Sequence, residues 1–171
     1  EILRIGMQMA QGLAAAHKQG LIHRDIKPSN ILLENGIERV KISDFGLARA
    51  VDDSSISHQG LIVGAPAYMS PEQCEGRTVD PRSDVYALGG MVFEMLTGRP
   101  PFIADSIAGL IYQHVHNPPE PPSRFRPGLS AEVETAVLRA LAKDPPERFA
   151  SASAFAEALA PGPRHDPGDA D

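Results

Sequence analysis

The densest group of reactive side chains occupies residues 23–30, which read His-Arg-Asp-Ile-Lys-Pro-Ser-Asn. This run supplies a carboxylate at Asp25, an ammonium at Lys27 and an amide oxygen at Asn30. A second carboxylate, Asp44, follows Asn30 by 14 residues. Hard oxygen ligands of this kind suit Mg²⁺, which usually binds one or two carboxylates and completes its coordination with phosphate and water. The residue types therefore predict a magnesium and phosphate site, with the lysine beside the phosphate and the second carboxylate orienting a hydroxyl nucleophile.

Two short strands are predicted to position these groups. Residues 31–33 and 40–42 are short, mostly apolar runs that include β-branched side chains, which favours strands. Asn35 and Gly36 lie between them, and Asn-Gly is the strongest short-range signal for a hairpin. Because the polar run precedes the first strand and Asp44 follows the second, a hairpin would bring the two segments side by side.

The rest of the chain is predicted to be mainly helical. Apolar residues at helical spacing run from Ile2 to Ala16. A second helix, from Val85 to Leu96 and closed by Gly98, is apolar nearly all round, so we expect it to be buried at the domain centre. Three shorter helices are predicted over residues 107–115, 130–141 and 151–159.

The composition indicates an ordered globular domain. The chain has 171 residues, of which 42% are hydrophobic, and 16 basic and 22 acidic residues give a net charge of −6. This balance provides no electrostatic reason to bind nucleic acid or an anionic membrane. No apolar run approaches the about 18 residues needed to span a bilayer. The single cysteine, Cys74, excludes a disulfide framework and fits a reducing compartment.

One internal stretch and the C-terminal end of the chain show no helical or strand pattern. The sequence opens with Glu1 inside a predicted helix and without a signal segment, so we expect it to be a fragment. Residues 46–71 have no periodicity and are predicted to form a long loop. Residues 161–171 are rich in Pro, Gly and Asp and are predicted to form a flexible tail or linker.

At this point the sequence resembles the eukaryotic-type protein kinases, which in bacteria are called Hanks-type kinases. It carries, in the family's order, the catalytic loop H-R-D-x-K-x-x-N, the D-F-G motif, a form of A-P-E, the D-x-x-x-x-G of the central helix and a late arginine. The joint order makes the match specific. The matching positions are residues 23–30, 44–46, 70–72, Asp84 with Gly89, and Arg148.

The resemblance implies catalytic roles for residues of the polar run. Asp25 is expected to be the catalytic base or to orient the substrate hydroxyl, and Lys27 to neutralise charge on the transferred phosphoryl group. Asn30 and Asp44 are expected to hold Mg²⁺. Leu32 matches the position that packs beneath the adenine ring of ATP. Lysine at position 27 is typical of the serine/threonine kinases.

The resemblance also implies a regulatory device. Residues 44–72 correspond to the activation segment, and Arg24 is expected to bind a phosphate attached to it. Ser57 is the predicted phosphorylation site, with Ser54 and Ser55 as further candidates. A phosphate carries a charge near −2 and orders a loop by docking on arginine.

Further positions are implied to be structural. Glu72 and Arg148 are expected to form a buried ion pair, and Asp84 to bind backbone amides of the catalytic loop. The family usually has Gly-Thr in the loop that receives the substrate, and its threonine hydroxyl contacts the catalytic residues. This chain has Gly64 and Ala65 there, which is expected to reduce the rate.

The implied fold is the large C-terminal lobe of a kinase domain, over residues 1–160. It is mainly α, with a small β-hairpin and a long activation segment, and belongs to a parent domain that is α+β. No G-x-G-x-x-G and no Val-Ala-x-Lys pattern occurs in the chain. We therefore expect the small N-terminal lobe to be missing.

The expected function is ATP-dependent phosphorylation of serine and threonine hydroxyls on protein substrates, by a longer kinase of which this chain is a part. Its expected cofactors are ATP and Mg²⁺, and its expected partners are protein substrates and, for autophosphorylation, a second kinase molecule. The isolated chain is expected to be inactive. The expected location is the cytoplasm, either free or as the cytoplasmic part of a membrane-anchored kinase.

Two alternatives remain open. The first is a non-catalytic scaffold or binding module with a truncated kinase fold, which Ala65 and the missing lobe favour and the intact Asp25 and Asp44 oppose. The second is a small-molecule phosphotransferase of kinase-like fold. Those enzymes usually lack segments like residues 44–46 and 70–72, so these segments favour a protein substrate.

Overall fold

The computed structural model describes residues 1–36, 39–45 and 66–160. It confirms a mainly helical domain with one small antiparallel sheet. The strands are β1 (Ile31–Glu34) and β2 (Arg39–Ile42). The helices are α1 (Ile2–Lys18), α2 (Pro71–Cys74), α3 (Pro81–Thr97), α4 (Ile107–His116), α5 (Ala131–Ala140) and α6 (Ala152–Leu159). Short 3-10 turns cover Pro28–Asn30, Pro66–Tyr68, Pro122–Arg124 and Pro145–Glu147.

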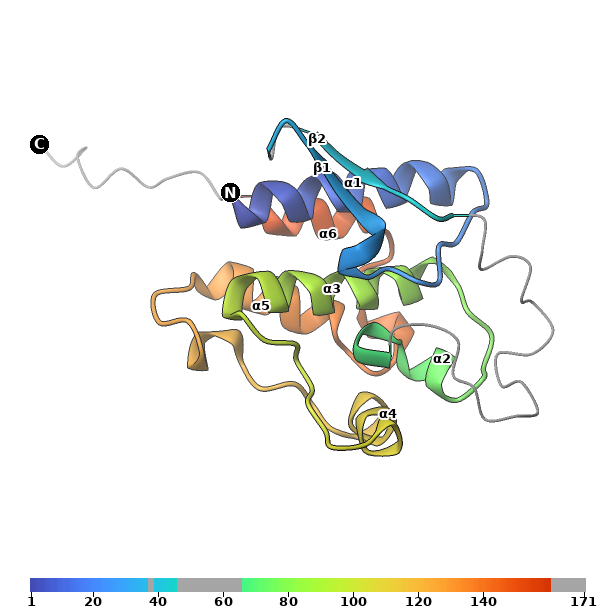
Figure 1. Cartoon of the computed structure of the whole chain (residues 1–171), viewed down its shortest axis with the longest axis vertical. Coiled ribbons are helices and arrows are strands. Elements are labelled where there is room, and N and C mark those ends of the chain that lie inside the picture. Colours follow the sequence, from blue (N-terminus) through green and yellow to red (C-terminus); the bar gives the residue numbers. More distant parts are fainter. Residues whose placement is uncertain (37–38, 46–65, 161–171) are drawn as a thin grey trace, which may run out of the picture.

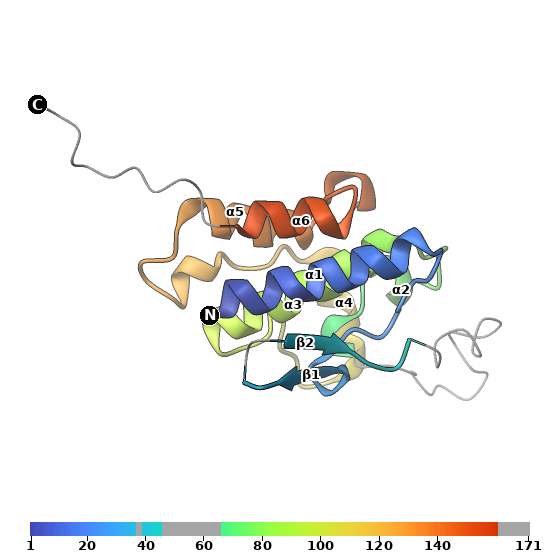
Figure 2. The same cartoon turned by 90° about the horizontal axis from the view of Figure 1, so that it is seen from above.

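The elements are stacked around α1 and α3 (Figure 1). α1 lies between α6 on one side and the β1–β2 hairpin on the other, and α3 packs against α1, α5 and α6 (Figure 2). α4 lies apart from these layers and packs against α2 and the turn Pro66–Tyr68. α1 therefore holds the hairpin against the helical core, next to residues 23–30, which lead into β1.

α1 forms because its apolar residues recur at helical spacing and face the core. Met9, Ala10 and Leu13 are buried on this face. The helix ends at Lys18, and Gly20 follows with a φ of 74°, the left-handed conformation typical of a residue just past a helix. This confirms the predicted stop.

The hairpin is also confirmed. Its register pairs Ile31 with Ile42 and Glu34 with Arg39. Asn35 and Gly36 adopt φ values of 52° and 75°, the conformation that makes Asn-Gly a favourable hairpin connection. Because β1 begins directly after residue 30 and β2 ends two residues before Asp44, the hairpin fixes both polar segments at the same end of the sheet.

α3 is the buried central helix that the sequence predicts. The side chain of Asp80 caps its first turn by accepting a hydrogen bond from the backbone of Arg82, and Gly98 ends it with a φ of 78°. Gly89 lets α5 approach closely, because a Cβ at this position would lie 2.8 Å from the Cβ of Ala140. α3 therefore forms the framework on which the other elements are placed.

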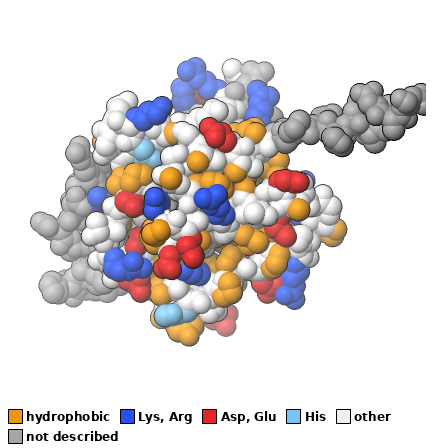
Figure 3. Space-filling view, turned by 180° about the vertical axis from the view of Figure 1, so that it is seen from behind, with side chains coloured by type: hydrophobic (Ala, Val, Ile, Leu, Met, Phe, Trp, Pro, Cys, Tyr) orange, Lys and Arg blue, Asp and Glu red, His pale blue; other side chains and the backbone are white. Residues whose placement is uncertain are grey.

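The surface of the described residues carries a mixture of charged and apolar side chains (Figure 3). On the face shown in Figure 3, acidic and basic side chains are interspersed among apolar ones. Within residues 1–36, 39–45 and 66–160, no helix has the length and apolar character to cross a membrane. The flexible tail predicted for residues 161–171 and most of the predicted loop 46–71 lie outside the described residues.

Candidate active site

Asp25 contacts both of the other predicted catalytic residues, Lys27 and Asn30. The ammonium of Lys27 lies 2.7 Å from the Asp25 carboxylate, and their side chains are 28% and 31% exposed. The Nδ2 of Asn30 donates to the backbone carbonyl of Asp25 at 2.8 Å and lies 3.4 Å from its carboxylate. The partly exposed carboxylate and ammonium can be reached by a substrate, and the buried amide of Asn30 lies directly behind the carboxylate.

The segment after β2 is bonded to this group. The backbone N–H of Ser43 donates to the carbonyl of Asn30 at 2.8 Å, which extends the hairpin by one bond. The hydroxyl of Ser43 donates to the exposed carboxylate of Asp44 at 3.1 Å. Asp44 has a φ of 64°, a left-handed conformation that is uncommon for residues other than glycine. The structure therefore places Ser43, the residue before Asp44, against the backbone of Asn30, so the two polar segments lie side by side as the hairpin predicts.

The side-chain oxygens of Asn30 and Asp44 are suitable ligands for a magnesium ion. Asn30 uses its Nδ2 as a donor, so its amide oxygen stays available, and no described group donates to that oxygen. Among the described residues, no cluster of three or more His, Cys, Asp or Glu side chains suits a metal. A cation held by Asp44 and Asn30 would therefore need further oxygens from a phosphate or water, which is how Mg²⁺ usually binds.

His23 joins the two polar segments. Its Nδ1 accepts a 3.2 Å hydrogen bond from the backbone N–H of Asp25, and its Nε2 donates to the carbonyl of Ser43 at 2.7 Å. These partners place the ring proton on Nε2, since a carbonyl can only accept. The ring also packs edge-on against Phe45. His23 thus connects the loop that carries Asp25 with the segment that carries Asp44.

Asp84, at the start of α3, binds the backbone of the loop that leads into Asp25. Its carboxylate accepts hydrogen bonds of 2.8 Å from the backbone N–H groups of His23 and Arg24, as the sequence predicts, and contacts His17 at 2.7 Å. It is 1% exposed. Arg24 has a φ of 70°, so Asp84 stabilises a strained backbone one residue before Asp25.

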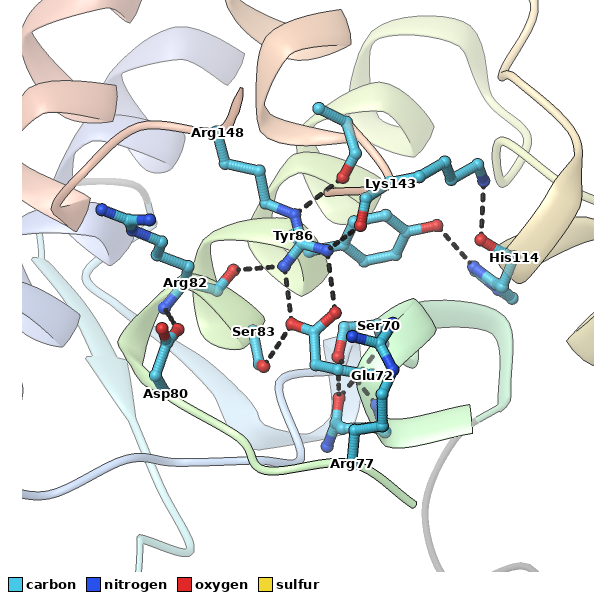
Figure 4. A network of polar contacts seen from close by, with 12 residues as sticks. Ser70, Glu72, Arg77, Asp80, Arg82, Ser83, Tyr86, His114, Lys143 and Arg148 are labelled. Atoms are coloured by element: carbon cyan, nitrogen blue, oxygen red, sulfur yellow. Dashed lines mark hydrogen bonds and ion pairs between the residues drawn. The ribbon is translucent and has the colours of Figure 1, made fainter. Parts of the chain in front are cut away.

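The expected ion pair between Glu72 and Arg148 is present (Figure 4). The guanidinium binds the carboxylate through two bonds, of 2.6 and 2.8 Å, and the side chains are 2% and 0% exposed. Burial raises the pKa of Glu72, but hydrogen bonds from Arg148 and Ser83 outweigh burial and hold it below its usual value. The other guanidinium hydrogens bind backbone carbonyls of Arg82, Ala142 and Lys143. This pair fixes α2 to the helical core.

A second buried cluster, not predicted from the sequence, joins α4 to this network (Figure 4). The hydroxyl of Tyr86 lies 2.8 Å from Nδ1 of His114, and the ammonium of Lys143 donates to the carbonyls of Gln113 and His114. Burial and the nearby Lys143 lower the pKa of His114 to about 4. Burial and Arg148 lower the pKa of Lys143 to about 8. Tyr86 lies on α3, His114 on α4 and Lys143 in the segment after α5. Because the cluster combines distant parts of the chain, no local pattern indicated it.

The remaining predicted site residues can be placed only in part. Leu32 lies on β1 with 52% of its surface exposed. The backbone of Arg24 is held as described above, and its predicted phosphate partners, Ser54, Ser55 and Ser57, lie outside the described residues. The same is true of Ala65. Burial raises the pKa of the Cys74 thiol to about 11, which agrees with an inert cysteine.

The fold and the site together define the large lobe of a protein kinase: a helical core around a buried α3, a hairpin, and a polar loop carrying Asp25, Lys27 and Asn30. Residues 1–159 match the protein kinase domain family. The chain belongs to this family. The relatives that it resembles are bacterial serine/threonine-protein kinases.

Three relatives show the extent of the similarity. Serine/threonine-protein kinase PknB of Mycobacterium leprae is 45% identical over 154 residues, which are 90% of this chain and 25% of the relative. PknB of Mycobacterium tuberculosis strain H37Rv is 48% identical over 145 residues, 84% of this chain and 23% of the relative. Serine/threonine-protein kinase Pkn1 of Myxococcus xanthus is 46% identical over 162 residues, which are 92% of this chain and 23% of the relative. The chain thus spans about a quarter of the length of these curated relatives.

Proposed function

We propose that this chain is the catalytic-loop lobe of a longer enzyme that transfers phosphate from ATP to serine and threonine hydroxyls of proteins. The observation that carries the proposal is the contact group of Asp25, Lys27 and Asn30, bonded through Ser43 to the segment of Asp44. Family membership and relatives that are serine/threonine-protein kinases support it.

Asp25 and Lys27 would act on the reacting groups. The Asp25 carboxylate is about one-third exposed, so a substrate hydroxyl can approach it, be oriented by it and give it its proton. The ammonium of Lys27, now bonded to that carboxylate, is within reach of a phosphoryl group beside it. In phosphoryl transfer such positioning and charge neutralisation supply most of the catalysis.

Asn30, Asp44 and Leu32 would bind the nucleotide. The free amide oxygen of Asn30 and the exposed carboxylate of Asp44 are the groups that would hold Mg²⁺. When bound, this ion would neutralise negative charge on the phosphates of ATP. The exposed side chain of Leu32 would cover one face of the adenine ring.

Regulation and partners follow from the same assignment. Phosphate on Ser57, or on Ser54 or Ser55, would dock on Arg24 and order the segment that receives the substrate. Autophosphorylation would then involve self-association of two kinase molecules. The site would work in the cytoplasm, where ATP and reduced thiols such as Cys74 coexist. Phosphopeptide mapping of active protein tests the serines, and phosphate-free serines in fully active protein would contradict this part.

The test uses the full-length protein that contains this chain, with labelled ATP, Mg²⁺ and a general protein acceptor. We expect label on serine and threonine, and we expect Asp44→Asn to reduce the rate by about 10²-fold or more, because it removes a metal ligand. Asp105→Asn, an exposed carboxylate outside the site, is the matched control and is expected to keep the wild-type rate. Equal rates for both variants, or label on a small molecule alone, would contradict the proposal.

The 171-residue chain by itself is expected to transfer no phosphate. It carries no glycine-rich phosphate loop and no Val-Ala-x-Lys strand to complete the positioning of ATP. If the full-length protein bound ATP or partners but transferred nothing, the scaffold alternative would replace the catalytic one.

A further inference from the structure

Gln73, in α2, joins its own helix to the loop that carries Asp25. Its Nε2 donates a 2.7 Å hydrogen bond to the backbone carbonyl of Arg24, 49 positions away in the sequence. Its Oε1 accepts hydrogen bonds from the backbone N–H and the hydroxyl of Ser70, at 3.1 and 3.2 Å. Both ends of this amide are therefore in use, one on the cap of α2 and one on the loop.

The partners determine which way the amide points. The carbonyl of Arg24 can only accept, so it needs the nitrogen of Gln73, and the N–H of Ser70 can only donate, so it needs the oxygen. A glutamate at position 73 could serve Ser70 but not Arg24. A methionine of similar size could serve neither.

The bond from Gln73 acts on the peptide group that leads into Asp25. The carbonyl of Arg24 and the N–H of Asp25 belong to one planar peptide. Gln73 holds its carbonyl side, while Nδ1 of His23 accepts from its N–H side at 3.2 Å. The preceding peptide is held as well, since the N–H of Arg24 donates to Asp84. The backbone at Arg24, with a φ of 70°, adopts a conformation that non-glycine residues keep only when their surroundings hold it.

We propose that Gln73 is a positioning residue for phosphoryl transfer, which fixes the plane of the Arg24–Asp25 peptide and with it the direction of the Asp25 carboxylate. This inference rests on the function proposed above. Gln73 follows Glu72, whose ion pair with Arg148 fixes α2 to the core. The amide of Gln73 thus connects the buried Glu72–Arg148 pair to the loop that carries Asp25. A small displacement of a catalytic carboxylate can lower the reaction rate by a large factor.

A purely local role, capping α2, makes a different prediction. Loss of a cap lowers stability and leaves the turnover of the folded enzyme unchanged. Loss of positioning lowers kcat while the KM for ATP stays the same, because Gln73 contacts no nucleotide-binding residue assigned above. The two roles are therefore separable by kinetics.

The experiment compares three variants of the full-length protein. Gln73→Glu keeps an acceptor for Ser70 and removes the donor to Arg24, and Gln73→Met removes both. The matched control is Gln113→Met, because Gln113 also donates its Nε2 to a backbone carbonyl, that of Ile103 at 2.9 Å, but on α4. Assays are run well below the melting temperature of every variant, and backbone amide exchange is measured at Asp25.

We expect kcat to fall about tenfold or more in both Gln73 variants, with KM for ATP within about twofold and with wild-type kcat in Gln113→Met. Exchange of the Asp25 amide should be faster in the Gln73 variants only. A kcat within about twofold of wild type in Gln73→Glu, or an equal fall in Gln113→Met, would overturn the inference. If the wild-type protein transfers no phosphate, the proposed function fails, and unchanged exchange at Asp25 would then overturn the positioning role independently.

Discussion

Two ion pairs near the catalytic loop are built in opposite ways. Arg148 and Glu72 lie 2.6 Å apart and are 0% and 2% exposed. Lys27 and Asp25 lie at a similar separation, 2.7 Å, but are 28% and 31% exposed. The first pair also binds backbone carbonyls and a serine hydroxyl, whereas the second leaves its surface open.

The difference in burial indicates that the Glu72–Arg148 pair is part of the structural framework, whereas the Asp25–Lys27 pair is available for chemistry. Removing one partner of a buried pair leaves an uncompensated charge, so such a pair cannot exchange partners. An exposed pair contributes only about 0–1 kcal/mol, because water screens it. Lys27 can therefore leave Asp25 for a phosphate at little cost, while Arg148 keeps α2 in place throughout.

The largest effect is expected from Arg148→Ala. It should lower the free energy of unfolding by about 3–5 kcal/mol, because Glu72 would remain buried without an opposite charge. Arg139→Ala, which removes an exposed guanidinium stacked on Phe149, is the control and should cost about 1 kcal/mol or less. Urea denaturation measures both. Equal costs would mean that the buried pair is no more important than a surface contact.

A pH change should weaken the framework through His114. Its pKa of about 4 in the folded state lies below the ordinary value of 6.5, so the unfolded state binds the proton more strongly. Stability from this residue is therefore full above about pH 6.5, falls as the pH drops, and levels off below about pH 4. The loss should reach roughly 3 kcal/mol.

The measurement is urea denaturation of wild type and His114→Gln between pH 7 and 4. The difference in stability between the two should shrink as the pH falls. A wild-type curve that runs parallel to that of His114→Gln would show that His114 does not titrate as described.

The packing of the framework is tested next by two adjacent glycines of α3. Gly89→Ala should cost about 1–3 kcal/mol, since its Cβ would lie 2.8 Å from that of Ala140. Gly90→Ala should be neutral or slightly stabilising, because its Cβ would lie 3.6 Å from the nearest atom, in the Tyr68 ring. Thermal unfolding distinguishes them. Similar melting temperatures for the two variants would mean that α3 and α5 can separate without cost.

The smallest effect on stability is expected at the catalytic carboxylate. Asp25→Asn should change the free energy of unfolding by less than about 1 kcal/mol, since it affects only a partly exposed ion pair and a long, 3.4 Å contact with Asn30. Asp84→Asn should cost about 1.5–3 kcal/mol, because it weakens charged hydrogen bonds from two backbone amides. A reversal of this order would contradict the division between framework and chemistry.

Much of the fold was predictable because its signals are local. The apolar pattern of α3 and the stop at Gly98 predicted the central helix, and Asn35-Gly36 predicted the hairpin. α2 was not predicted, because four residues are too few to show a helical period. Its position depends instead on the bond between Glu72 and Arg148, which are 76 positions apart.

The contacts among the candidate site residues could be predicted only in part. Family motifs indicated Asp25, Lys27, Asn30 and Asp44, and the hairpin explains why they lie together. The contact from Gln73 to the Arg24 carbonyl could not be predicted, because a glutamine that binds a distant backbone group leaves no pattern in the sequence. The same holds for the buried His114 and its neighbours on other elements.

The most direct test of the account measures phosphoryl transfer and unfolding on the same sample of full-length Asp25→Asn. We expect the rate to fall by about 10²–10⁴-fold, the usual contribution of a general base, while the melting curve overlays that of wild type. A rate within about threefold of wild type would contradict the assignment of Asp25 to the chemistry. A large fall in melting temperature would contradict the claim that this carboxylate lies outside the framework.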